Sequence, residues 1–113
     1  MNNRKVYISG EIVPEVDAKI SIFDSAVLLG DTVTESTRTF NFKPFKLDEH
    51  LERLYKSFKL TRIDPQMTIE EMKKVSLELL EINKDNYKTN EDCWLVHNIS
   101  RGHSITGGNP ALQ

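Results

Sequence analysis

The order of hydrophobic patterns in this 113-residue chain predicts an α+β domain, with a small antiparallel-rich sheet and two amphipathic helices. Runs rich in β-branched and aromatic residues come first and continue to residue 40. Two stretches with apolar residues at helical spacing follow, and a last apolar run over 93–99 returns to the strand pattern. Strands, then helices, then a further strand is an order typical of α+β domains.

The predicted strands are separated by clear turn signals. Residues 6–9 and 11–14 flank Gly10, and this pattern predicts a tight hairpin. The segment 18–29 mixes apolar and polar residues, which favours a loop or a short helix. Residues 32–40 are rich in β-branched side chains, which suit a pleated strand better than a helix. The run 93–99 is more uniformly apolar, so we expect a strand largely buried in a sheet.

Two helices are predicted by periodicity and by a start signal. The apolar stripe of the first consists of Leu47, Leu51, Leu54 and Phe58. The second begins after Thr68, because Thr68 and Glu71 have the spacing of a capping box. Its expected buried stripe consists of Ile69, Met72, Val75, Leu79 and Ile82.

Composition excludes several classes of function. Fifteen basic and seventeen acidic residues leave a net charge of −2, which disfavours a nucleic-acid partner. The N-terminus has no long apolar run, so we expect neither a signal peptide nor a membrane span. The single Cys93 cannot close an intramolecular disulfide, which fits a cytoplasmic protein. The three histidines lack the paired spacing of zinc ligands, so no metal site is expected.

Two pairs of basic residues could bind an anion. His50 and Arg53 are three residues apart and would be neighbours on a helix face. Arg101 and His103 are two apart and would project from the same face of a continuing strand. Solvated basic side chains on an exposed helix and at a strand end are the simpler interpretation of both pairs.

A succession of motifs joins these residues. Gly30-Asp31 is followed by Glu35-x-x-Arg38, and then by His50-x-x-Arg53-Leu54. The succession resembles the N-terminal domain of class IV (fold-type IV) aminotransferases, which are pyridoxal-phosphate enzymes. These include branched-chain and D-amino-acid aminotransferases and aminodeoxychorismate lyase. The resemblance covers nearly the whole chain, from about residue 7 to residue 102.

The resemblance implies roles for single residues. In the family, the arginine of His-x-x-Arg-Leu helps to hold the cofactor phosphate, which implies cofactor binding by Arg53. Arg101 and His103 match a pair that recognises the substrate α-carboxylate and reaches the partner subunit's site, which implies a homodimer. Leu29 and Thr34 stand at substrate-pocket positions where the family usually has aromatic residues. We expect the two arginines to converge on one cavity.

The resemblance also implies an activity for the family and the absence of its catalytic lysine from this chain. The family transfers an amino group between an amino acid, branched-chain or D-type, and a 2-oxo acid. Its catalytic lysine lies in a second domain, so we predict a class IV N-terminal domain over 1–106 and a linker or tail over 107–113. No catalytic residue is then expected here, and pyridoxal 5′-phosphate would bind weakly or not at all without the second half. Two alternatives remain open: a non-catalytic dimerisation or interaction module, and a fragment of an aminodeoxychorismate lyase-like enzyme.

Overall fold

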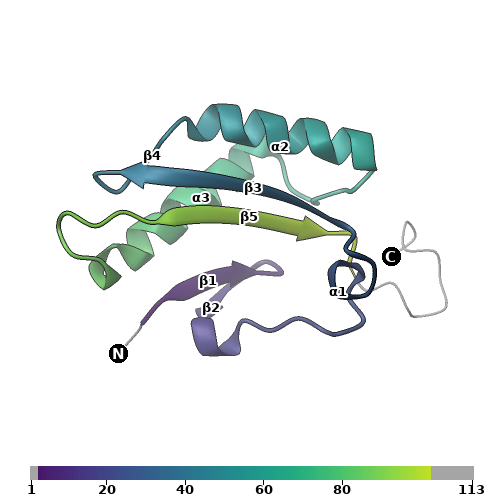
Figure 1. Cartoon of the computed structure of the whole chain (residues 1–113), viewed down its shortest axis with the longest axis horizontal. Coiled ribbons are helices and arrows are strands. Elements are labelled where there is room, and N and C mark those ends of the chain that lie inside the picture. The colour runs from purple at the N-terminus through teal and green to yellow at the C-terminus, as the bar shows by residue number, and fades with distance from the viewer. Residues whose placement is uncertain (1–2, 103–113) are drawn as a thin grey trace.

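The computed structural model describes residues 3–102, and Figure 1 shows the strands with the two long helices on one side of them. The elements in chain order are β1 (Lys5–Ile8), β2 (Glu11–Pro14), the 3-10 turn η1 (Glu15–Asp17), α1 (Ser25–Leu29), β3 (Thr32–Phe40), β4 (Lys43–Pro44), α2 (Leu47–Thr61), α3 (Ile69–Asn83), the 3-10 turn η2 (Lys84–Asn86) and β5 (Trp94–Ser100). The predicted α+β class is confirmed. The boundary predicted at residues 106 and 107 lies outside the described residues.

The strands form two antiparallel sheets. β1 and β2 make the predicted hairpin, and β3 lies between β4 and β5 in a three-stranded sheet. The register of β3 and β5 runs from Thr32 opposite Ser100 to Arg38 opposite Trp94. Helices α2 and α3 lie on the same side of this sheet, and the other face carries no helix in the described part of the chain (Figure 1).

Alternation of side chains decides which residues of β3 and β5 are buried. Every second side chain of β3, from Val33 to Thr39, points to the helices and is buried, whereas the residues between them are exposed. β5 follows the same rule, so Leu95 is buried while Trp94 is 66% exposed. The prediction that β5 is largely buried was therefore wrong for one of its faces, because no described element covers that face.

The apolar core lies between the sheet and the two long helices. The predicted stripe of α2 is confirmed, with Leu51 and Leu54 fully buried. The capping box at Thr68 is also confirmed, with both of its reciprocal hydrogen bonds present. Within residues 3–102, no helix combines the length and the apolar character that a membrane crossing requires.

The predicted stripe of α3 is partly wrong, because the helix is rotated about its axis. Its buried side chains are Met72, Ser76 and Leu80, and Ile82 is 42% exposed. Ser76 can face the sheet because its hydroxyl bonds to Met72 O at 2.7 Å and to His97 Nε2 at 2.8 Å. Burial of a hydroxyl costs little when its hydrogen bonds are made.

Candidate functional site

One cluster of charged side chains joins β3 to α2. Glu35 lies at the middle of β3 and points to the helices, and its side chain is 6% exposed. Arg53 on α2 meets it side-on, with Nε at 2.9 Å from Oε2 and Nη2 at 2.5 Å from Oε1. His50, one turn earlier on α2, places Nδ1 at 2.7 Å from the same Oε1. The sequence therefore brings a buried carboxylate under a pair of basic groups.

The cluster fixes the charge of its members. The Arg53 hydrogen bonds and, less strongly, the contact with His50 lower the pKa of Glu35 to about 2, although burial opposes this shift. Glu35 in turn raises the pKa of Arg53, so the guanidinium is charged at any physiological pH. Near neutral pH, the Glu35 carboxylate is therefore negatively charged and the Arg53 guanidinium is positively charged.

Arg53 has unused capacity to bind an anion. Its side chain is 68% exposed, and Nη1 has no partner among the described residues. A guanidinium held at one edge presents its remaining N–H groups in a fixed plane, which suits the oxygens of a phosphate. The group is therefore able to bind a phosphate without breaking any contact that it makes here.

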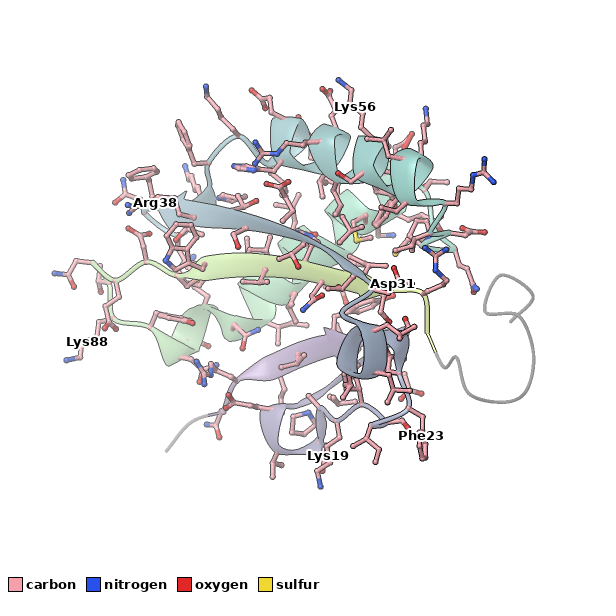
Figure 2. The ribbon with its side chains drawn as sticks, turned by 45° about the vertical axis from the view of Figure 1, so that its right-hand side comes forward. Lys19, Phe23, Asp31, Arg38, Lys56 and Lys88 are labelled. Atoms are coloured by element: carbon pink, nitrogen blue, oxygen red, sulfur yellow. The ribbon has the colours of Figure 1, made fainter. Side chains whose placement is uncertain are left out.

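Arg101 has a different environment at the end of β5. Its Nε donates to Asp31 Oδ2 at 2.7 Å, and Nη2 is 3.4 Å from Asp31 Oδ1. Nη2 and Nη1 also donate to the carbonyl oxygens of Thr61 and Arg62, at 2.8 and 3.0 Å. These carbonyls belong to the last turn and the C-cap of α2, where helical partners are missing. Arg101 thus ties the end of β5 to the residue before β3, Asp31 (labelled in Figure 2), and to the end of α2.

The other predicted substrate-binding residues lie apart from the Arg53 cluster. Thr34 is exposed on the open face of the sheet, opposite Asn98 in the register. Leu29 ends α1 and is 71% exposed. His103 lies outside the described residues, so its predicted pairing with Arg101 stays a prediction.

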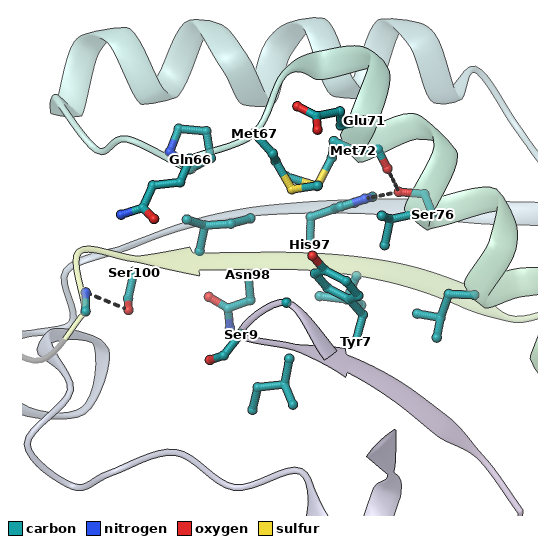
Figure 3. Close-up of a pocket in the computed structure, with 18 of the residues that line it drawn as sticks. Tyr7, Ser9, Gln66, Met67, Glu71, Met72, Ser76, His97, Asn98 and Ser100 are labelled. Carbon is teal, nitrogen blue, oxygen red and sulfur yellow. Dashed lines mark hydrogen bonds between the residues drawn. The ribbon is translucent and has the colours of Figure 1, made fainter. Parts of the chain in front are cut away.

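A cavity of about 740 Å³ lies between β1, α3 and β5 (Figure 3). Arg101 is one of the lining residues, but Arg53 is not. Along α2, Thr61, whose carbonyl accepts from Arg101, lies eight positions after Arg53, which is a rise of about 12 Å. The expected convergence of the two arginines on one cavity is therefore not seen in the described part of the chain.

The comparison with known families decides the identity. The family model described as amino-transferase class IV matches residues 32–110, which is more than half of the chain. This chain belongs to the class IV aminotransferases. The matched region begins at β3 and contains Glu35, His50, Arg53 and Arg101.

Relatives of this class IV domain are longer proteins. A Methanocaldococcus jannaschii protein, provisionally named a branched-chain-amino-acid aminotransferase, is 47% identical over 106 residues, which are 94% of this chain and 35% of that protein. The D-alanine aminotransferase of Staphylococcus haemolyticus is 37% identical over 79 residues, 70% of this chain and 28% of that enzyme. The chain spans about a third of the length of these curated relatives.

Solved structures share the fold of this class IV domain. The branched-chain aminotransferase of Thermoproteus uzoniensis, solved with norvaline, has a TM-score of 0.78 at 27% identity, over 92% of this chain and 35% of that one. The branched-chain aminotransferase of Escherichia coli has a TM-score of 0.76 at 28% identity, over 89% of this chain and 33% of that one. The observed arrangement of β3, α2, α3 and β5 is therefore that of solved branched-chain enzymes.

Sequence reasoning assigns no separate role to two acidic residues of this class IV domain. Glu35 and Asp31 were used only to define the sequence motif. In the structure Glu35 binds Arg53, and Asp31 binds Arg101. A signal for Glu35 was available, because period-two alternation places it on the same face as Val33 and Thr37. A carboxylate on a core-facing position needs a cationic or hydrogen-bonding partner.

Proposed function

We propose that this chain is the phosphate-holding N-terminal part of a pyridoxal-phosphate-dependent aminotransferase, with Arg53 binding the cofactor phosphate. The observation that carries this proposal is the side-on pairing of Arg53 with Glu35, which leaves Nη1 unpartnered among the described residues on a 68% exposed side chain. When bound, the cofactor supplies an electron sink for chemistry at the amino-acid α-carbon. The free edge of the Arg53 guanidinium fits the phosphate group of this cofactor.

The reaction that we propose for the whole protein is amino-group transfer between an amino acid, branched-chain or D-type, and a 2-oxo acid. Support comes from relatives that are named as aminotransferases for these substrates. We also propose a cytoplasmic homodimer, and complementation by a separate C-terminal half. Exposed apolar side chains such as Val16, Ile22 and Trp94 support a further buried contact. Sedimentation of the chain as a strict monomer at high concentration would argue against self-association.

The test of the phosphate role is the binding of pyridoxine 5′-phosphate to the 113-residue chain. This probe keeps the phosphate and the ring but has no aldehyde, so it cannot react with lysines at random. We expect Arg53→Ala to weaken binding at least tenfold, because a charge-assisted pair of hydrogen bonds is lost. Lys56→Ala is the matched control, since Lys56 is an exposed cation one turn along the same helix (Figure 2). The resemblance implies weak binding by the chain alone, so the probe is titrated to high concentration. Equal affinity of Arg53→Ala and the native chain, or no binding by either, would refute the role in this chain.

The chain alone is not expected to transaminate. By the resemblance, the family's catalytic lysine lies outside the third of the family's length that this chain spans. The check is incubation with pyridoxal 5′-phosphate, an amino acid and a 2-oxo acid, followed by borohydride reduction and peptide mapping. A stoichiometric cofactor adduct on one lysine, together with keto-acid turnover, would contradict the expectation.

A further inference from the structure

We propose that Glu35 is a positioning residue, whose buried carboxylate fixes the guanidinium of Arg53 so that its free edge faces the phosphate. The inference rests on the proposed function, because it concerns how the same arginine is held. It adds a role for an acidic residue at a site that binds an anion.

The first support is the geometry of the pair. Glu35 engages Arg53 through two parallel hydrogen bonds, Nε to Oε2 and Nη2 to Oε1. Two bonds fix the plane of the guanidinium as well as its position, whereas one bond would leave it free to rotate. The free group, Nη1, then points away from the carboxylate in a defined direction.

The second support is the rigidity of the carboxylate itself. Glu35 sits in the central strand of the three-stranded sheet and its side chain is 6% exposed. His50 Nδ1 contacts Oε1 at 2.7 Å from the neighbouring helical turn, and so gives the carboxylate a second fixed contact. Arg53, by contrast, is a long side chain on the exposed face of α2. Without its buried partner, it would lose rotamer entropy each time it bound a phosphate.

The third support concerns the negative charge of Glu35. This charge cannot by itself explain why a phosphate would bind beside Glu35. A carboxylate beside a phosphate repels it, so Glu35 weakens phosphate binding by its charge alone. Positioning and electrostatics therefore predict opposite results when the charge is removed. If only charge mattered, Glu35→Gln would bind phosphate more tightly than the native chain.

The experiment measures the affinity of pyridoxine 5′-phosphate for the native chain and for Glu35→Gln and Glu35→Asp. We expect both variants to bind about three- to tenfold more weakly, which is the range for ordering one long side chain on binding. Glu35→Asp keeps the charge but is one methylene shorter, so it isolates reach from charge. Thr37→Val is the matched control, because Thr37 lies on the same face of β3 and is also buried. Its affinity should equal that of the native chain.

A second measurement reports on Arg53 directly. The Nε–H proton of Arg53 should exchange slowly with water in the native chain and at least tenfold faster in both Glu35 variants. Glu35→Gln keeps only one acceptor oxygen and Glu35→Asp is one methylene shorter, so neither variant can make the two-bond contact. Pyridoxine without phosphate should bind the native chain and the Glu35 variants equally. Circular dichroism identifies a variant that does not fold. If one Glu35 variant does not fold, the affinity of the other variant and the Nε–H exchange of the native chain test the positioning role.

The outcomes separate the two proposals. If Arg53→Ala binds the probe as well as the native chain does, the phosphate role fails and the positioning role fails with it. If Arg53→Ala binds weakly but both Glu35 variants bind as tightly as the native chain or more tightly, only the positioning role is overturned. Fast Nε–H exchange in the native chain would also overturn it.

Discussion

Replacing Glu35 with glutamine should lower the stability of the domain by an amount that depends on pH. The side chain is almost isosteric, so packing around β3 is kept while the ion pair with Arg53 is lost. An ordinary carboxyl pKa of 4.5 against a folded-state pKa of about 2 corresponds to about 3 kcal/mol at most. Because Arg53 is 68% exposed, solvent screens the pair, and we expect about 1–2 kcal/mol at pH 7.

The sign of the pH dependence follows from the lowered pKa. In the folded chain Glu35 releases its proton more readily than in the unfolded chain, so its stabilising effect is complete above about pH 5. The effect is lost as the pH falls from about 4.5 toward 2, where the folded carboxyl itself becomes protonated. The difference between the native chain and Glu35→Gln should therefore shrink steadily over this range.

Urea unfolding followed by circular dichroism at pH 7, 4 and 3 measures this difference. The control is Glu78→Gln, an exposed acidic position on α3 with no partner among residues 3–102, which should change stability by less than about 0.5 kcal/mol. A Glu35→Gln deficit that stays constant from pH 7 to pH 3 would refute the electrostatic account. So would equal stability of the two chains at pH 7.

Three further substitutions test the packing and the caps. Thr37→Val should raise the free energy of unfolding by about 1 kcal/mol in urea, because the buried Thr37 hydroxyl has no partner among the described residues. Arg101→Ala should lower it by about 2 kcal/mol and speed hydrogen exchange in the last turn of α2, since Asp31 and two helix carbonyls lose their donor. Thr68→Ala should cost about 1 kcal/mol, measured by thermal unfolding, because the capping box at the start of α3 is removed.

Local patterns predicted the elements well where the interactions that define them are close in sequence. The strand over 32–40 has the bounds that β-branched residues suggested, and the start of α3 follows from the spacing of Thr68 and Glu71. Both signals are complete within one element, so no knowledge of the rest of the fold is needed. Gly30, which ends α1 at φ 66°, is another local signal of this kind, although the mixed pattern of segment 18–29 left a loop and a short helix both open.

Predictions failed where an element meets a distant part of the chain. The rotation of α3 depends on the hydrogen bond between Ser76 and His97, twenty-one residues away, and hydrophobic periodicity ranks a serine as exposed. The exposed face of β5 could not be anticipated either, because a run of apolar residues does not show how many faces are covered. Trp94 and Val96 are exposed, although they belong to an apolar run that is typical of a buried strand.

The candidate site shows the same limit at the level of single residues. The proximity of His50 and Arg53 follows from helical geometry, and their ring and guanidinium nitrogens are 3.4 Å apart. Their common partner Glu35 lies fifteen and eighteen residues away, on another element. Alternation on β3 indicates that Glu35 is buried, but only the packing of α2 on β3 shows which cation meets it.

The two arginines differ in what a ligand would have to displace. Arg53 keeps its Nη1 group unpartnered among the described residues, so a phosphate can be added to the existing contacts. Arg101 already donates to Asp31 and to two carbonyl oxygens at the end of α2, and it is 23% exposed. A substrate carboxylate at Arg101 would have to compete with a carboxylate that is already in place, or use the N–H groups left over. For this reason the geometry supports an anion-binding role for Arg53, and carboxylate recognition by Arg101 stays a prediction from the family resemblance.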